Sequence, residues 1–223
     1  MKNIIELKNV TKEYRSGGNT VLALKDVDFD LSQGESAAIV GPSGSGKTTF
    51  LQLIGGLDTP TSGEVFINGD LINNLKDDEL SRLRNKTIGF VFQFFNLQDY
   101  YTAKENVAIP LIISGKDEKK ALEKAEKLLG QVGLSKRVDH KPNQMSGGEM
   151  QRVAIARSLA NNPKVILADE PTGNLDKDNA TKVLDLFKEI SKSGVSVITV
   201  THDTRISAYF DNVVSLEDGE ITS

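Results

Sequence analysis

The chain has 223 residues, enough for one large domain or two small ones. Its 31 acidic and 27 basic residues give a net charge of −4, which argues against a nucleic-acid-binding protein that relies on bulk positive charge and against a basic membrane anchor. Cysteine is absent, which excludes disulfides, thiolate metal sites and cysteine nucleophiles.

The sequence contains no apolar run of the roughly 18 residues that a membrane helix needs; "VAIPLII" is among the longest. The first residues, "MKNIIELKNVTKEY", alternate apolar and polar side chains and lack the apolar core of a signal peptide. We therefore expect a cytosolic protein, or one held at a membrane only by a partner.

Short strands and helices are predicted to alternate along much of the chain. Aspartates alternate with apolar residues over 26–31, the pattern of a half-buried strand. "SAAIVG" (36–41) indicates a buried strand that leads into a helix. Similar short apolar runs follow in "TIGFVFQ" (87–93), "KVILADE" (164–170) and "VSVITVTHD" (195–203). This alternation predicts an α/β fold with a mainly parallel sheet covered on both faces, and a ligand site at the carboxyl ends of its strands.

The middle of the chain has little strand signal between about residues 95 and 159. There "KDEKKALEKAEKLLGQVG" (116–133) places apolar residues on one face of a helix. We expect a helical subdomain over about 95–159, inserted into a core formed by about 1–94 and 160–223. The end of the chain, "NVVSLEDGEITS", predicts a hairpin that turns at Asp218-Gly219.

A phosphate-binding loop is predicted directly after the strand at 36–40. The pattern G-x-x-x-x-G-K-[ST] is matched by Gly41, Pro42, Ser43, Gly44, Ser45, Gly46, Lys47 and Thr48, and Thr49 follows it. Glycines let backbone N–H groups converge on phosphate oxygens at the start of a helix. Lys47 would reach the β- and γ-phosphates, and the Thr48 hydroxyl would ligate Mg²⁺. The alternative is a glycine-rich turn with a surface lysine, but the buried strand before it and the apolar helix after it favour a phosphate site.

Two adjacent carboxylates end the run "VILADE". We assign Asp169 to Mg²⁺ and Glu170 to the water that attacks the γ-phosphate. The alternative is a strand end that carries two solvated acids.

With these motifs the sequence resembles the ATP-binding-cassette (ABC) ATPases over essentially its full length, as a single domain of that type with an N-terminal antiparallel region. The resemblance implies ATP and Mg²⁺ as ligands. It also gives roles to eight further residues. Tyr14 stacks on adenine, and Gln93 is the Q-loop glutamine, a catalytic residue and a Mg²⁺ ligand. Ser146-Gly147-Gly148-Glu149 is the signature motif, Asp176 closes the D-loop, and His202 is a catalytic residue that senses the γ-phosphate. The alternatives are that His202 is an ordinary satisfied polar residue and that Tyr14 packs under the strand loop.

The signature motif departs from the usual Leu-Ser-Gly-Gly-Gln, because it begins with Met145 and ends with Glu149. Ser146 and Glu149 also form a capping-box pattern, which would turn the carboxylate back onto the Ser146 N–H and away from phosphate. Gly147 and Gly148 would leave the helix end bare for an anion. The resemblance implies that this motif covers ATP held by a second copy, so two copies would sandwich two nucleotides.

The segments "GFVFQFFNL", "DEPTGNLD" and "VTHD" resemble the branch that serves lipoprotein release, macrolide and peptide efflux, and cell division. The resemblance implies a homodimer on ATP binding, an integral membrane permease as partner, no nucleic acid, and a place at the inner face of the cell membrane. It puts the coupling helix of the permease against the segment that holds Phe94, Phe95, Leu97, Tyr100 and Tyr101, although some of these side chains could anchor the helical subdomain instead.

Three other classes of ABC-type protein are alternatives to a transporter subunit. A DNA-repair or chromosome-organising cassette would need coiled-coil arms, and no sustained heptad run is present. A soluble cassette for cofactor assembly remains an alternative. Glu170 and His202 argue against an inactive nucleotide-binding module.

Overall fold

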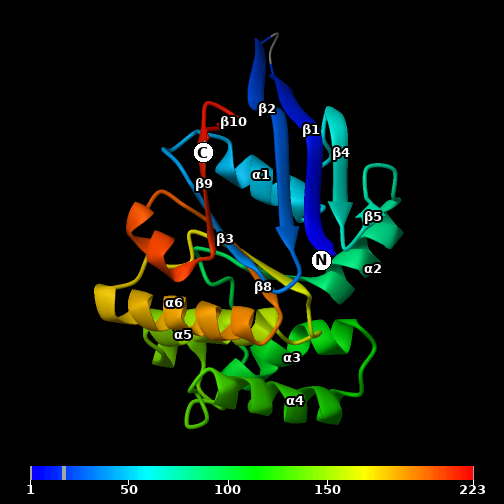
Figure 1. Cartoon of the computed structure of the whole chain (residues 1–223). Coiled ribbons are helices and arrows are strands. Elements are labelled where there is room, and N and C mark those ends of the chain that lie inside the picture. Colours follow the sequence, from blue (N-terminus) through cyan, green and yellow to red (C-terminus); the bar gives the residue numbers. More distant parts are fainter. Residues whose placement is uncertain (1, 17–18, 223) are drawn as a thin grey trace.

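The computed structural model describes residues 2–16 and 19–222 and contains two sheets (Figure 1). The first sheet is antiparallel, as predicted for the N-terminal region. Its strand order is β2-β1-β4-β5, with β1 at Asn3–Ser16, β2 at Asn19–Ser32, β4 at Ser62–Ile67 and β5 at Asp70–Leu71. The alternation over residues 26–31 is confirmed, because Val27, Phe29 and Leu31 are buried and the aspartates that alternate with them are exposed.

The second sheet is parallel except at its last strand, and its order is β10-β9-β3-β8-β7-β6. Its strands are β3 (Ser36–Val40), β6 (Ile88–Val91), β7 (Val165–Asp169), β8 (Ser196–Thr201), β9 (Asn212–Glu217) and β10 (Glu220–Ile221). The predicted C-terminal hairpin is confirmed: Asp218 and Gly219 both have positive φ, as a tight two-residue turn requires.

Helices cover both faces of the parallel sheet. Helix α1 (Lys47–Ile54) lies between this sheet and the antiparallel one, and it contacts β1, β2 and β4 as well as β7 and β8 (Figure 1). On the other face lie α5 (Gly147–Ser158) and α6 (Lys177–Lys192), and α3 (Ala103–Ile113) and α4 (Glu118–Gln131) pack in turn on α5. Within the described residues no strand lies between Val91 and Val165. Short 3₁₀ helices occupy Pro142–Gln144 and Thr204–Tyr209.

Polar caps set where four of these helices begin. Side chains of Thr102, Asp117, Ser146 and Asp176 accept hydrogen bonds from the first turns of α3, α4, α5 and α6. Helix α2 (Asp77–Thr87) was not predicted from the sequence, since only Leu80 and Thr87 are buried and no apolar stripe marks it. Its signal lies in its charges, acidic in the first turn and basic in the last, which suit the helix dipole.

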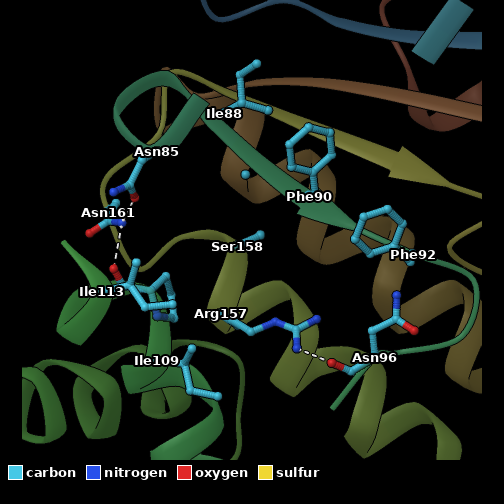
Figure 2. Close-up of a pocket in the computed structure, with 12 residues that line it drawn as sticks. Asn85, Ile88, Phe90, Phe92, Asn96, Ile109, Ile113, Arg157, Ser158 and Asn161 are labelled. Atoms are coloured by element: carbon cyan, nitrogen blue, oxygen red, sulfur yellow. Dashed lines mark hydrogen bonds between the residues drawn. The ribbon is translucent and has the colours of Figure 1, made fainter. Parts of the chain in front are cut away.

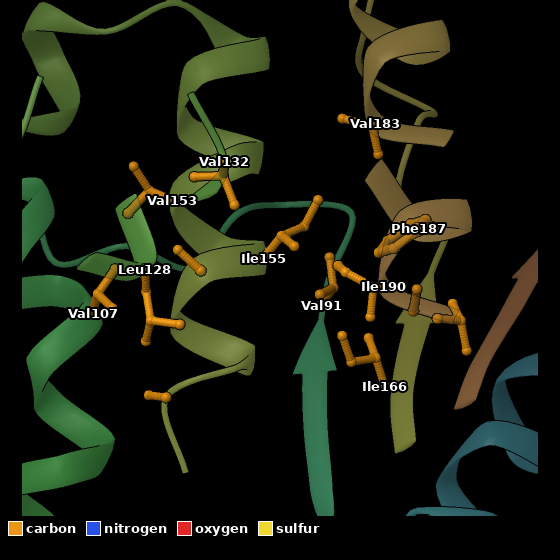
Figure 3. Packing of buried hydrophobic residues seen from close by; sticks show 14 of the residues in the cluster. Val91, Val107, Leu128, Val132, Val153, Ile155, Ile166, Val183, Phe187 and Ile190 are labelled. Atoms are coloured by element: carbon orange, nitrogen blue, oxygen red, sulfur yellow. The ribbon is translucent and has the colours of Figure 1, made fainter. Parts of the chain in front are cut away.

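The core consists of two apolar clusters, one on each face of the parallel sheet. Successive strand residues serve opposite clusters: Ile166 and Ala168 face α5 and α6, whereas Val165 and Leu167 face α1. Figure 3 shows the first cluster, in which Phe187 of α6 lies between the helices and the strands. The strands are therefore buried on both faces, which explains their short uninterrupted apolar runs. No helix in the described part of the chain is both long enough and apolar enough to cross a membrane.

Phe187 is 1% exposed and fills the space between α6 and the sheet. We predict that Phe187→Ala lowers the free energy of unfolding by about 3–5 kcal/mol, because it removes a buried ring and leaves a cavity. Urea denaturation followed by circular dichroism measures the change. Lys188→Ala, at the next and exposed position of α6, is the matched control and should change stability by no more than about 0.5 kcal/mol. Equal effects of the two substitutions would contradict this packing.

Candidate functional site: a phosphate-binding cavity and a separate signature helix

A cavity of about 420 Å³ lies at the carboxyl ends of β3, β7 and β8, where the sequence predicts a ligand site. Its walls come from both sheets and from the loop before α1. They are formed by Tyr14, Val21, Leu22, Ala23, Ser43, Gly44, Gly46, Lys47, Thr48, Thr49, Asp169, Glu170 and His202. The volume lies within the range of small-molecule sites, roughly 300–1,000 Å³.

The glycines of the loop at 41–48 are required by close backbone packing. A Cβ on Gly41 would lie 2.1 Å from the Leu216 carbonyl oxygen, and one on Gly46 would lie 2.4 Å from that of Ala23. Gly44 has a φ of +83° and open space where a side chain would be. The loop is therefore held tightly at both ends and is bare in its middle, where backbone N–H groups can approach an anion.

Lys47 lies under this loop. Its Nζ donates hydrogen bonds to the carbonyl oxygens of Gly41 (2.9 Å) and Pro42 (2.7 Å). Burial lowers the pKa of Lys47, and the nearby charges of Glu170 and Asp169 partly oppose that shift. An anion in the cavity would favour the charged ammonium, so the position suits a phosphate ligand.

The donor set around Asp169 fits Mg²⁺ held jointly with phosphate. Burial, and then the charge of Glu170, raises the pKa of Asp169, although Lys47 lowers it. A cation would stabilise this carboxylate. Within the described residues there is no cluster of three or more His, Cys, Asp or Glu side chains that could cage a metal. Mg²⁺ commonly uses one or two carboxylates together with substrate phosphates and water, and Thr48 and Asp169 both line the cavity and can serve it in this way.

Glu170 is held in an unusual conformation next to His202. Its φ is +43°, in the left-handed region that non-glycine residues seldom adopt. One carboxylate oxygen lies 2.7 Å from His202 Nδ1 and accepts the His202 backbone N–H at 3.0 Å, and the other accepts the Thr201 hydroxyl at 2.9 Å. The structure thus brings the two residues into direct contact. Thr201, which is buried and holds the second carboxylate oxygen, was not predicted from the sequence.

Gln93 does not line the cavity. Its backbone carbonyl accepts a hydrogen bond from Asn174 Nδ2 at 3.1 Å, and its side-chain Nε2 lies 3.3 Å from where a Cβ on Gly173 would be. Gln93 is therefore placed beside the loop that follows Glu170, next to the cavity rather than in its wall.

Tyr14 lies in the cavity wall on β1, with 38% of its surface exposed. Across the strand pair it faces Val21 of β2, and Leu22 and Ala23 continue the same wall. These three β2 residues were not predicted from the sequence. Their signal is an apolar Val21-Leu22 pair that stays solvent-exposed in the fold.

The capping box predicted at the start of α5 is confirmed. The Ser146 hydroxyl accepts from the Glu149 N–H at 3.3 Å, and one Glu149 oxygen accepts from the Ser146 N–H at 2.9 Å. The other Glu149 oxygen accepts a hydrogen bond from Arg137 Nε at 2.9 Å. This contact was not predicted from the sequence. The backbone hydrogen bond from Ser146 is the largest cause of the lowered pKa of Glu149, and Arg137 contributes to it. The carboxylate is folded back, and Arg137 compensates its charge. The Ser146 hydroxyl also donates to this carboxylate at 3.1 Å, so the hydroxyl hydrogen points to Glu149 rather than outward.

The two signature glycines differ in environment, which corrects the expectation that both leave the helix end bare. A Cβ on Gly148 would lie 2.5 Å from the Asn179 side chain, so Gly148 serves the packing of α5 against α6. A Cβ on Gly147 would meet only ordinary contacts at 3.6 Å or more. Asn179 is held in turn by Asp176, which caps α6 and accepts from Asn179 N at 2.9 Å and from its Nδ2 at 2.6 Å.

None of residues 146–149 lines the cavity that contains the phosphate loop. Within one chain the two glycine motifs are thus parts of separate surfaces.

A second hollow, an apolar groove of about 330 Å³, lies between β6, α3 and α5 (Figure 2). Phe90, Phe92, Ile109 and Ile113 line it together with Arg157. Arg157 donates to the backbone carbonyls of Phe95 (2.8 Å) and Asn96, and so attaches the segment after Gln93 to α5. Ile113 is 75% exposed at the groove.

The aromatic segment next to the groove is divided between packing and exposure. Leu97 packs against the apolar cluster of the helical region, and Phe95 is half-buried. Phe94 is 72% exposed and Tyr100 is 88% exposed, and Tyr101 is also exposed. Two of the five side chains therefore anchor the segment, and three remain at the surface.

Comparisons with known proteins agree with this geometry. The profile of the ABC transporter family matches residues 24–173. An uncharacterised ABC transporter ATP-binding protein of Methanocaldococcus jannaschii is 48% identical over 98% of this chain and 95% of its own length. A lipoprotein-releasing system ATP-binding protein of Syntrophus aciditrophicus is 45% identical over 99% of both.

Solved structures give the same result. A dimeric structure of the same archaeal cassette, in a post-hydrolysis state bound to ADP and Pi, superposes with a TM-score of 0.90 at 46% identity, covering 98% of this chain and 97% of that one. A cassette of Clostridium perfringens described as part of an ABC transporter complex has a TM-score of 0.90 at 29% identity, covering 100% of this chain and 88% of that one. With a family match over two thirds of the chain and close relatives over nearly all of it, this chain belongs to the ABC transporter family, as an ATP-binding subunit that hydrolyses ATP.

Proposed function

We propose that two copies of this chain close on two ATP molecules, and that this closure drives a membrane permease. The P-loop cavity of one copy holds each ATP, and the signature helix of the other copy covers its γ-phosphate. The observation that carries this proposal is that Ser146–Glu149 form a helix start outside the cavity of their own chain. A relative that is solved as a dimer with ADP and Pi supports it.

Within each cavity the chain's own residues divide the work. The P-loop backbone and Lys47 bind the phosphates, and Tyr14 stacks on the base. Glu170, fixed by Thr201 and His202, orients the attacking water. His202 keeps Glu170 in place and contacts the γ-phosphate, and Asp176 adjoins the dimer interface. Mg²⁺, held by Thr48 and Asp169 with Gln93 beside it, would neutralise developing charge on the phosphates.

We propose that the chain is a single domain with a core of about 1–94 and 160–223 and a helical subdomain of about 95–159. The groove lies where these parts meet. Because Arg157 attaches the carbonyls of Phe95 and Asn96 to α5, a shift of the helical part would move the segment that follows Gln93. This arrangement could carry a change at the γ-phosphate to the groove.

The occupant proposed for the groove is a short cytoplasmic helix of the permease. The groove is lined mainly by apolar side chains, and Phe92 and Asn96 in its wall belong to the chain segment that continues to Tyr101. That segment also carries the exposed aromatic residues Phe94, Tyr100 and Tyr101, a composition typical of protein interfaces. The protein would then lie at the inner face of the cell membrane through this partner. The relatives that are named for lipoprotein release favour that branch of the family.

Glu170→Gln keeps the size of the side chain but removes the charge that polarises water. We predict that hydrolysis falls by about 10²–10⁴-fold and that ATP then holds two copies together as a stable dimer in gel filtration. Glu170→Gln combined with Lys47→Ala is the control, since it should lose ATP and remain monomeric. A Glu170→Gln protein that stays monomeric in saturating ATP, or hydrolyses at the normal rate, would count against the proposal.

Glu149→Gln should change ATPase activity and ATP-driven dimerisation little, because glutamine caps the helix equally well. Arg137→Gln alone should weaken dimerisation by up to about fivefold, since it leaves the Glu149 charge uncompensated near the partner's phosphate. The double variant should dimerise like the original protein. Dimerisation midpoints in ATP for the three variants test this, and a marked tightening by Glu149→Gln alone would mean that the carboxylate faces phosphate.

Tyr100→Ala with Tyr101→Ala, and separately Ile113→Asp, should leave the isolated protein folded and able to bind ATP. Both should sharply reduce recovery of the complex, because they remove apolar contact area for the permease helix. Co-purification with a tagged permease subunit is the measurement. Val213→Asp is the control, since Val213 is an exposed apolar residue on β9, outside the groove. Undiminished recovery in the first two variants, or equal loss in the control, would contradict the proposed docking surface.

A further inference from the structure

A charged cluster outside the nucleotide cavity fixes the hydroxyl of Tyr14. The Tyr14 hydroxyl donates to one oxygen of Asp58 at 2.8 Å. The other oxygen accepts from Lys12 Nζ at 2.6 Å and from the Thr59 N–H at 2.7 Å. Lys12 Nζ also donates to the Thr59 carbonyl at 2.7 Å. Asp58 is not itself in the cavity wall, and its hydrogen bond to Tyr14 links it to the candidate site.

The cluster has the protonation states that this arrangement needs. Burial raises the pKa of Tyr14 and the hydrogen bond to Asp58 adds to the rise, so the phenol stays a donor. Burial also acts to raise the pKa of Asp58, but the hydrogen bonds from Lys12, Tyr14 and Thr59 outweigh it and lower the pKa. The carboxylate therefore stays ionised and remains an acceptor.

Lys12 also contacts the Tyr14 ring directly. Its ammonium lies over the Tyr14 ring, 4.9 Å from the centroid, while its own side chain is almost fully buried. Lys12 thus occupies one ring face, so a base that stacks on Tyr14 in the cavity would use the opposite face.

Asp58 is itself tied to the helix that begins at the phosphate loop. It follows α1 in the chain, and its backbone N–H donates to the Gln52 carbonyl of that helix at 3.3 Å. Helix α1 therefore carries phosphate-binding residues at its start and leads directly into the acceptor for Tyr14.

We propose that Asp58, supported by Lys12, is a positioning residue that holds the Tyr14 ring ready for the adenine base. The inference rests on the proposed stacking role of Tyr14. A ring that is fixed before ATP arrives loses less rotational freedom on binding, so the cluster should add affinity for the base and none for the phosphates.

The plainer possibility is that Lys12 and Asp58 only join β1 to the loop after α1 and stabilise the fold. Tyr14→Phe separates the two roles, because it removes a single hydroxyl and leaves the Lys12–Asp58 pair and the ring in place.

The experiment measures dissociation constants for ATP and for inorganic tripolyphosphate by calorimetry, in EDTA so that no turnover occurs. Tyr14→Phe and Asp58→Ala should each weaken ATP binding by about two- to tenfold and leave tripolyphosphate binding unchanged relative to the control Asp78→Ala, an exposed acid on α2. Tyr14→Ala should weaken ATP binding further and again spare tripolyphosphate.

The results distinguish the positioning role of Asp58 from the stacking role of Tyr14. If Tyr14→Ala weakens ATP binding but Tyr14→Phe does not, Tyr14 contacts the base and Asp58 does not position it, which overturns the inference alone. If Tyr14→Ala leaves ATP binding unchanged, the stacking role fails and the inference fails with it. Equal losses for ATP and tripolyphosphate in Tyr14→Phe would also overturn the inference, since they would indicate a general effect on the site.

Discussion

The order of strands in the parallel sheet brings the residues of the nucleotide cavity together. Strands β3, β8 and β7 are neighbours, although β3 lies more than a hundred residues from the other two in the chain. Parallel strands end at the same edge, so the P-loop after β3, His202 after β8 and the two acids at the end of β7 meet there. The backbone hydrogen bond from Glu170 N to Val200 O, 2.9 Å long, then sets Glu170 against His202. Without this strand order these residues would be isolated polar side chains at separate loop ends.

Helix capping fixes the starts of α5 and α6, which hold the predicted signature and D-loop residues. Ser146 and Asp176 begin α5 and α6, and each is a position to which the family resemblance gives a second role. Asn179 joins them, because it is held by Asp176 and packs into the space left by Gly148. Both helix starts are therefore preorganised relative to each other, so that a partner's phosphate would meet a surface already formed.

Local patterns in the sequence predicted the alternation of strands and helices, the loop that borders the cavity and the capping box, because all three are short-range features. Tyr14 and His202, which also line the cavity, were expected there from the family resemblance. The residues that were missed act over long range. Arg137 reaches Glu149 and Asp58 reaches Tyr14 through folding alone. Thr201 gains its role only from the hydrogen bond that it donates to Glu170, and the β2 residues Val21–Ala23 gain theirs only from the cavity that they line. The expectation that Gly148 leaves the helix end bare was wrong for the same reason, since nothing near it in the chain indicates the contact with Asn179 of α6.

In the proposed dimer each complete ATP site needs the P-loop of one copy and the signature helix of the other. Mixing two variants, each of which lacks one of these two parts, is a direct test of this arrangement. Lys47→Ala disables the first, and Gly147→Glu places a carboxylate where the partner's phosphate would lie. The structure accommodates a side chain at Gly147, and an acid suits the first turn of a helix, so this variant should fold. The measurement is the ATPase rate of the two inactive variants after mixing. We expect activity to return, because the mixed dimer contains one intact site. Mixtures as inactive as either variant alone would show that both motifs act within the same chain.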